Sequence, residues 1–513
     1  MSHTATVTHY TAYKPRPFTR KERDNVTVLY GGLTWKHERL VQGVFNNLKY
    51  NARPLPNISR PDLDAGKELI DVGACCPTIF TTGNLANFLK SEVAARGKEE
   101  VVNNYVYLTA GACGPCRFGQ YHQSYAMALD GLGLGDFRMF LLAQDELDQG
   151  SGNGAGLEIN LPLSLGLIWA ILCGDVLTDL EYLVRPYEIT PGQTDKVMQE
   201  SVELLFEVFK KRPDRGKKWK TIAWHLMSGY FTRALREVRR RWDSIEVDRL
   251  QVKPKVKITG EFWLQTHEGD GNYNIKRWLE QEGAEVIAPP VAVWLNYLMH
   301  PTIRKLEHRQ EMNSNSGRLK MAILTAVERI YQKTYNRFRK ALGNLPYELP
   351  DQMELKQLAE PFYHFELRGG EGHMLIGKAL YAYHHKKAHM ICELSPYSCM
   401  PNTMSVGAMA NVTGKYPDLL YAPIEVKGDA EVHALSRCQM ILTEAKRRAQ
   451  KEFEEVMEKT GLTLEAIRKY EERHPEVRRA TYRVPHLGCA GTAANYVLHL
   501  AAKGGVARTA RSM

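Results

Sequence analysis

The sequence predicts an α/β fold with mainly parallel sheets, because short apolar strands recur along the chain with helical stretches between most of them. The 513 residues, of which 44% are hydrophobic, are enough for two or three packed domains. Residues 190–250 have the pattern of long, heavily charged helices without a strand candidate. We therefore expect two Rossmann-like domains joined by a helical connector, with a charged helical C-terminal region after them.

The first strand is expected at residues 26–32, where a β-branched run ends in paired glycines, and residues 36–50 follow as an amphipathic helix. Similar apolar runs predict six more strands, at residues 102–109, 137–143, 256–260, 284–289, 389–394 and 419–426. Helical crossovers between these strands favour parallel pairing.

Domain boundaries follow from the same changes of pattern. We expect a flexible N-terminal tail at residues 1–20, an N-terminal α/β domain at 21–189, the helical connector at 190–250, a second α/β domain at 251–450 with a helical insert at about 302–342, and a helical C-terminal region with a basic tail at 451–513. The first α/β domain contains Cys76 and a CxxC motif, and the second contains Cys399.

Composition favours a cytoplasmic protein. The polar N-terminus lacks the apolar core of a secretory signal or membrane anchor, and the apolar run at 161–173 is shorter than the ~20 residues that cross a bilayer, so it predicts a buried helix. Nine cysteines, an odd number, predict reduced thiols rather than a disulfide framework. The 68 basic and 58 acidic residues are interspersed, so we expect no nucleic-acid partner.

The cysteines occur in three loops that each follow a predicted strand. Cys113 and Cys116 form the CxxC motif between a strand and a helix, Cys75 and Cys76 are adjacent in an earlier loop, and Cys399 lies in a later one. In open α/β sheets ligands bind beyond the carboxyl ends of the strands. The three loops are therefore expected to converge on one metal or cluster site.

An iron–sulfur cluster is the interpretation that uses all of these thiols, with Cys75 as the alternative to Cys76. Backbone amides near Gly114 and the positive charge of Arg117 would stabilise such a cluster. Two other readings stay open: a structural zinc site, which usually shows two paired knuckles, and a redox dithiol formed by the CxxC motif alone.

Three acidic or basic side chains are candidates for proton delivery. His267 and Glu268 lie in a loop that follows the strand ending at Gly260, and Glu371 lies in a later glycine-rich loop. A reduction needs protons with its electrons, and such groups can supply them. Loop hydrogen bonding and helix capping are the structural alternative for all three.

The cysteine motifs resemble those of the 2-hydroxyacyl-CoA dehydratase and benzoyl-CoA reductase superfamily, in its activase-associated, double-cubane-cluster-like branch. The resemblance is carried by GACGPCRFGQY at 111–121, Cys76 with Pro77, and PYSCMPN at 396–402. It continues at residues 185–188, 260–261, 283–286 and 370–372, and so spans residues of about 25 to 450.

This resemblance implies a 4Fe-4S or double-cubane cluster held by Cys76, Cys113 or Cys116, and Cys399. It also implies an oxygen-sensitive homodimer that accepts low-potential electrons from a separate ATP-hydrolysing iron–sulfur activator and reduces a small molecule or CoA thioester. Residues 372–379 have P-loop spacing, but Ala379 replaces the Ser or Thr that would hold magnesium, so the ATPase is expected on another polypeptide. The alternative functions are a non-catalytic electron relay and a zinc-stabilised scaffold.

Overall fold

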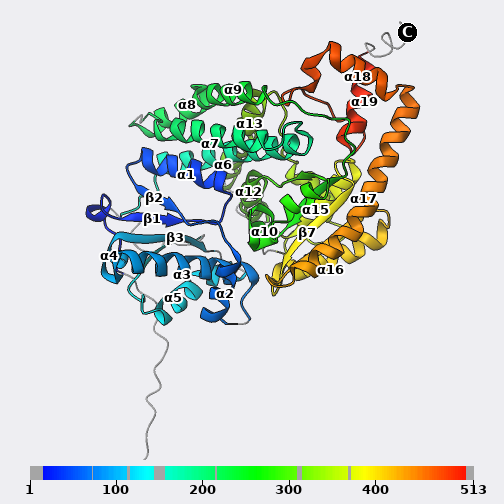
Figure 1. The fold of residues 1–513 in the computed structure, drawn as a ribbon. Helices are drawn as coiled ribbons and strands as arrows, with labels where there is room; N and C mark the ends of the chain where they lie inside the picture. The colour runs from blue at the N-terminus through cyan, green and yellow to red at the C-terminus, as the bar shows by residue number, and fades with distance from the viewer. Residues whose placement is uncertain are drawn as a thin grey trace, which may run out of the picture.

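The protein contains two four-stranded parallel sheets surrounded by helices (Figure 1). The structure is a computed structural model that describes residues 16–71, 73–111, 116–143, 156–213, 216–308, 315–367 and 371–503. The fold is thus mixed α/β, as the sequence predicted.

The first sheet has the strand order β2-β1-β3-β4, and every neighbouring pair is parallel. Its strands are β1 (Thr27–Tyr30), β2 (Asn51–Pro54), β3 (Tyr105–Gly111) and β4 (Arg138–Ala143). The connecting helices are α1 (Trp35–Asn47), α2 (Arg60–Leu69), α3 (Cys76–Arg96), α4 (Lys98–Asn104), the 3-10 helix η2 (Arg117–Gln120) and α5 (Tyr121–Gly131).

The second sheet repeats this topology with the order β6-β5-β7-β8, again all parallel. Its strands are β5 (Lys255–Gly260), β6 (Glu285–Ile287), β7 (Met390–Pro396) and β8 (Leu420–Val426). The connecting helices are α10 (Phe262–Thr266), α11 (Ile275–Gln281), α12 (Val291–His308), α13 (Asn315–Ala341), α14 (Gln352–Ala359), α15 (His373–His384) and α16 (Met400–Lys415).

Each of the seven expected strands is present, with ends shifted by up to three residues. The sequence analysis missed β2, whose segment NARP contains no apolar run and ends in proline. Strand β2 pairs only with β1, so it is an edge strand, where proline and polar residues are tolerated.

The segment of the chain that connects the last strand of the first sheet to the first strand of the second forms α6 (Leu161–Val184), α7 (Gln193–Lys210), α8 (Lys218–Met227) and α9 (Tyr230–Trp242). Helix α6 packs against α1, α7, α8, α12 and α13 and also reaches β6 of the second sheet. In the part of the chain that the structure describes, Leu161–Tyr187 is the one helical stretch long and apolar enough to cross a membrane, and 61% of its most apolar window is buried. This burial agrees with the buried helix expected from the sequence.

The C-terminal helices are α17 (Glu431–Thr460), α18 (Leu464–Arg473) and α19 (Thr492–Ala502). Figure 1 shows α17 running past β7 and α16 toward α18 and α19 at the upper edge. These helices bury a separate apolar cluster that includes Phe453, Ile467 and Tyr496 together with Leu250. The expected basic tail from residue 504 onward lies outside the described residues.

Helices α2 and α3 approach each other closely at Gly83, where a Cβ atom would overlap the carbonyl oxygen of Asp62. We predict that Gly83→Ala lowers the free energy of unfolding by about 3 kcal/mol, because neither backbone can move aside without disturbing the packed pair. Denaturant unfolding measures this change. Gly407→Ala, at an open position within α16, is the control and should raise stability by up to about 1 kcal/mol.

Candidate functional site

The carboxyl ends of the two sheets face each other, and the loops that follow the strands are in contact. The backbone N–H of Cys76, at the start of α3, donates to the carbonyl of Tyr397, just after β7, at 3.4 Å. The backbone N–H of Arg60 donates to Asp270 at 2.9 Å, and Lys67 pairs with Asp429 at 2.7 Å. The strand order reverses between β1 and β3 in the first sheet and between β5 and β7 in the second, which is where open α/β sheets bind ligands.

Four of the predicted cysteine ligands lie at the starts of helices. Cys75 is the N-cap residue of α3, Cys116 is the N-cap of η2, which leads into α5, and Cys399 is the N-cap of α16. Cys76 is the first residue of α3 and is buried. Unpaired N–H groups and the helix dipole make such positions favourable for negative charge. The cysteine-bearing loop before α3 thus contacts the cysteine-bearing loop after β7 through the hydrogen bond between Cys76 and Tyr397.

The Cys116 and Cys399 thiols share an acidic neighbour, Glu261. Burial raises the pKa of Cys116 to about 11 and the pKa of Cys399 to about 12, and the nearby Glu261 carboxylate contributes to both rises. Backbone N–H groups of Phe118 and Asn402 act in the opposite direction. Without a cation beside them these thiols therefore stay protonated at neutral pH.

Cys75 and Cys76 occupy different environments. The Cys75 sulfur lies 3.0 Å from the Thr78 hydroxyl and 3.2 Å from the Tyr121 hydroxyl and is hydrogen-bonded to both. Burial raises the pKa of Cys76 above its ordinary range, and Cys75, Glu261 and Asp429 raise it further. Tyr121, which the sequence analysis did not single out, belongs to the site through its contact with Cys75.

The CxxC loop is described only in part. Cys113 and Gly114 lie outside the described residues, whereas Arg117 is placed and its guanidinium donates to the carbonyl of Gly73. This contact ties the loop after β3 to the segment before α3. Over the described residues, no three His, Cys, Asp or Glu side chains are grouped so that they could hold a metal ion.

Glu261, which was not among the predicted proton donors, is a carboxyl group whose pKa suits proton transfer near neutral pH. It follows β5 directly, and its side chain accepts from the backbone N–H of Leu264 at 2.9 Å. The preceding Gly260 has φ +122°, and a Cβ there would overlap the backbone of Leu394. Burial raises the pKa of Glu261 to about 7, and Glu371 contributes to the rise. The sequence feature that could have identified Glu261 as a candidate is its position directly after a predicted strand that ends in glycine.

Glu371, which acts electrostatically on Glu261, forms a buried hydrogen-bonded triad with Gln265 and Lys378. Its carboxylate accepts from Gln265 at 2.9 Å and from the Lys378 ammonium at 3.0 Å, and Lys378 also donates to Gln265 at 3.1 Å. Burial raises the pKa of Glu371, although Lys378 and Gln265 oppose the rise. Lys378, which appeared in the P-loop-like segment, is thus a buried partner of Glu371 within α15.

Glu268 belongs to a buried ion-pair cluster. The Lys36 ammonium lies 2.7 Å from Glu268 and 2.6 Å from Glu181, and the Tyr182 hydroxyl donates to Glu268 at 3.2 Å. Burial alone would raise the pKa of Glu268, but Lys36 and Lys276 lower it well below its usual range. A carboxyl that stays ionised is a poor proton donor at neutral pH. The geometry therefore favours a structural and charge-setting role for Glu268.

His267 is buried against an aromatic ring. Its imidazole stacks on Trp263 with ring centroids 4.6 Å apart, and its Nε2 atom has no hydrogen-bond partner among the described residues. Burial and the nearby Lys276 lower the pKa of His267 to about 3. The ring is therefore neutral at physiological pH. The five residues of α10 separate it from Glu261.

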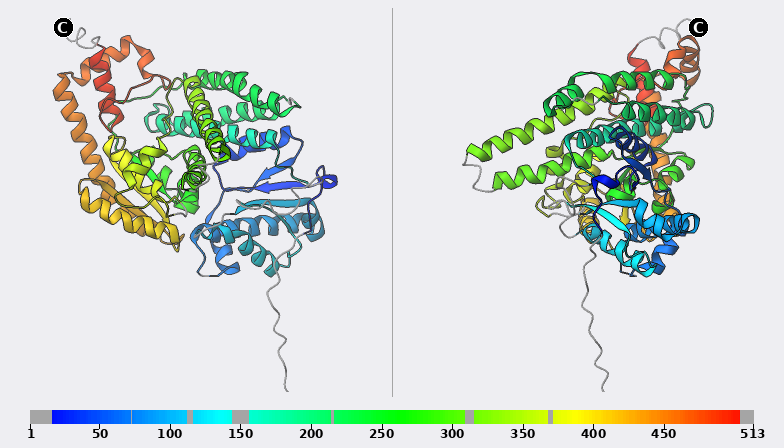
Figure 2. Two further views of the ribbon diagram at one scale, coloured as in Figure 1. Left: turned by 180° about the vertical axis from the view of Figure 1, so that it is seen from behind. Right: turned by 90° about the vertical axis from the view of Figure 1, so that its left-hand side faces the viewer.

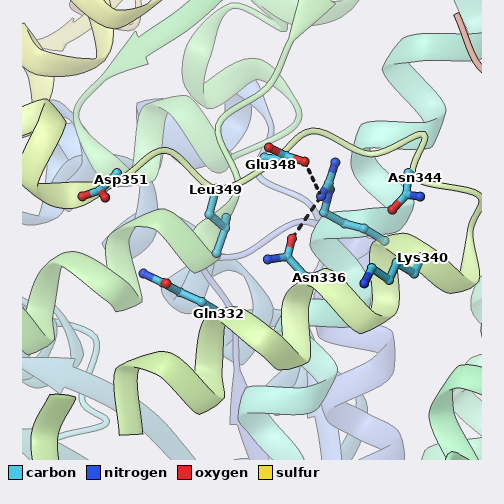
Figure 3. Close-up of a pocket in the computed structure, with 8 residues that line it drawn as sticks. Gln332, Asn336, Lys340, Asn344, Glu348, Leu349 and Asp351 are labelled. Atoms are coloured by element: carbon cyan, nitrogen blue, oxygen red, sulfur yellow. Dashed lines mark hydrogen bonds and ion pairs between the residues drawn. The ribbon is translucent and has the colours of Figure 1, made fainter. Parts of the chain in front are cut away.

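A polar hollow of about 400 Å³ lies away from these residues, near the C-terminal end of α13 (Figure 3). Its central side chain, Arg339, is held by Asn336 and Glu348, each at 3.0 Å. None of the predicted site residues lines this hollow. Because its arginine is already neutralised, we do not assign it the chemistry of the cysteine site.

No protein-family model matches the chain, and no curated protein matches it. The functional conclusion therefore rests on the chemistry of the facing loops and on the resemblance of the cysteine motifs.

We predict that Lys36→Met lowers the free energy of unfolding by about 3 kcal/mol, because it removes the buried cation that Glu181 and Glu268 share and leaves Glu181 paired with Arg185 alone. Denaturant unfolding at neutral pH measures the loss. Lys451→Met, which removes an exposed pair with Glu455, should change stability by less than about 0.5 kcal/mol. Equal effects of the two substitutions would contradict a structural role for the buried cluster.

The lowered pKa of His267 predicts a contribution to stability that is complete above the unfolded-state pKa and is lost as pH falls toward the folded value of about 3. Between pH 7 and pH 5 this single group should remove about 2 kcal/mol of stability. We expect His267→Gln to be less sensitive to pH by that amount over this interval. Unfolding curves of both proteins at the two pH values test the expectation, which fails if their pH dependence is the same.

Proposed function

We propose that this protein is the iron–sulfur component of a two-component reductase or dehydratase-like enzyme. It would accept low-potential electrons from a separate ATP-hydrolysing iron–sulfur activator and reduce a small molecule or a CoA thioester. The observation that supports the proposal is that Cys76, Cys116 and Cys399 all lie at the starts of helices, and that the hydrogen bond from Cys76 to Tyr397 joins the cysteine-bearing loops of the two sheets.

The donor set fits an iron–sulfur cluster in its chemistry. Soft thiolate ligands select such clusters, and buried thiols with raised pKa values need a strong positive charge beside them before they ionise. Cys76, Cys116 and Cys399 would hold the cluster, with Cys113 completing the set and Cys75, which acts electrostatically on both Cys116 and Cys399, as the alternative to Cys76. Bound there, a 4Fe-4S or double-cubane cluster supplies one-electron chemistry.

Proton supply is the second requirement of a reduction. Glu261, with its pKa raised to about 7 and its side chain still partly accessible, suits this role better than the ionised Glu268 or the neutral His267. Glu371 contributes to the raised pKa of Glu261, and Lys378 forms an ion pair with the carboxylate of Glu371. We therefore assign proton delivery to Glu261 with Glu371, and charge balance to Glu268. An electron relay would not need acids of this kind beside the thiols.

An electron donor also needs a docking surface near the cysteines. Tyr397, Met400 and Met404 are 45%, 52% and 42% exposed, and they lie immediately before and along the first turns of α16, beside Cys399. Methionine side chains are flexible and polarisable and recur in adaptable binding surfaces. This apolar rim supports docking of the activator at α16.

The finer architecture follows from the repeated strand order. We infer that each four-stranded sheet with its helices is a Rossmann-like domain, that α6 to α9 form the connector, and that the protein acts in the cytoplasm as a homodimer. The order 2-1-3-4 seen in both sheets is the core of doubly wound folds, which bind ligands where the strand order reverses.

We predict that protein purified without oxygen is brown, contains iron and acid-labile sulfide, and loses both in Cys116→Ser and in Cys399→Ser, because each substitution removes a thiolate ligand. Iron and sulfide analysis with a visible spectrum measures this. Cys489→Ser, which changes a cysteine outside the site, should retain the colour.

A colourless protein with bound zinc would overturn the redox proposal in favour of a scaffold. A cluster that survives in Cys399→Ser would remove the second sheet from the ligand set. If the cluster is present, Glu261→Gln should keep the iron content but slow substrate reduction, which separates proton delivery from cluster assembly.

A further inference from the structure

Helices α12 and α13 form a hairpin that projects from the body of the protein, as the two green helices on the left of the right-hand view show (Figure 2). The C-terminal half of α13 is anchored, because Tyr331, Tyr335 and Phe338 are buried in the largest apolar core. The N-terminal half, from about residue 318 to 330, has no fully buried side chain. This half of α13 therefore presents a long face to solvent.

That face carries an apolar stripe. Leu319, Ile323 and Ile330 are 63%, 53% and 42% exposed, and the exposed Ala326 lies between them. The four residues follow one another at intervals of four, three and four, which is the heptad spacing of a coiled-coil seam. Val327, 47% exposed, widens the stripe. Because a helix that is apolar on two sides is normally covered on both, the stripe indicates a missing partner.

The shape of the stripe favours a helical partner. It is narrow, it consists of aliphatic residues and one alanine, and it contains no aromatic side chain, whereas helices that lie in a bilayer surface usually carry a wide face with Trp or Phe. Knobs-into-holes packing requires apolar residues at this heptad spacing. The seam from Leu319 to Ile330 is roughly 17 Å long, enough for three turns of a second helix.

The charges beside the seam define the partner further. With Leu319 and Ala326 as d positions and Ile323 and Ile330 as a positions, Lys320 occupies an e position and Arg329 a g position. Arg318 and Lys333 are also exposed, and among the described side chains between residues 317 and 333 no acidic one is classed as exposed. Pairing with a second copy would set these cations against each other, whereas Glu or Asp at the partner's e and g positions would pair with them.

We propose that the N-terminal half of α13 is a docking site for a partner protein that presents an amphipathic helix with an aliphatic seam flanked by acidic residues. The site lies on the hairpin, apart from the cysteine-bearing loops, and it does not depend on the redox function.

The test uses the full-length protein and two synthetic peptides with leucine at a and d positions, one with glutamate at e and g and one with lysine there. Fluorescence anisotropy should show binding of the glutamate peptide and not of the lysine peptide. Ile323→Ser with Ile330→Ser should weaken binding by roughly tenfold or more, because two aliphatic side chains leave the seam. Val432→Ser, at an exposed apolar position of α17, is the matched control and should bind normally.

Charge reversal by Lys320→Glu with Arg329→Glu should exchange the preference to the lysine peptide. Binding of neither peptide, or equal binding of both, would overturn the proposal. It would also be overturned if sedimentation shows a dimer that dissociates in the Ile323→Ser, Ile330→Ser protein without peptide binding, which would make the seam a self-interface. Seam-dependent binding to phosphatidylserine vesicles without peptide binding would likewise replace the proposed partner with a membrane surface.

Discussion

The buried ammonium of Lys36 is the interaction on which the relation between the two sheets depends. Lys36 lies on α1 beside the first sheet, Glu181 lies on α6, and Glu268 lies in the loop after α10 at the end of the second sheet. Burial opposes the charge on Lys36, but the two carboxylates raise its pKa above the ordinary value. Since an unpaired charge here would be costly, burying these three segments together requires the contact to be kept. The ion-pair cluster thereby links the first sheet, α6 and the loop at the end of the second sheet.

The strands were the most predictable part of the fold, because central strands of parallel sheets are apolar on both faces and stand out in the sequence. Edge strand β2 could not be predicted from an apolar run, because its segment is polar and forms a strand only through its pairing with β1. The apolar part of α6 was predicted as a buried helix. Its contacts with α1 and with β6 of the second sheet depend on long-range packing that periodicity does not encode.

The candidate site was predictable in its residue types and only in part in its chemistry. Strand-end cysteines could be located because carboxyl ends of parallel strands meet at one edge. Ionisation states could not be predicted, because they depend on partners distant in sequence: Glu268 is held ionised by Lys36, His267 is held neutral by burial near Lys276, and Glu261 acquires its pKa of about 7 from its surroundings. Sequence identifies which groups can titrate, and the fold decides which of them do so near neutral pH.

The contribution of both halves of the chain to one cysteine site has a consequence for biosynthesis. Cys76 and Cys116 leave the ribosome long before Cys399, because most of the second sheet must be translated between them. At about 5 to 20 residues per second, the early thiols wait for roughly 15 to 60 s before the last one exists. During that interval they have neither their final burial nor the contact between Cys76 and Tyr397. The nascent chain is thus the form of this protein in which oxidation of the site is easiest.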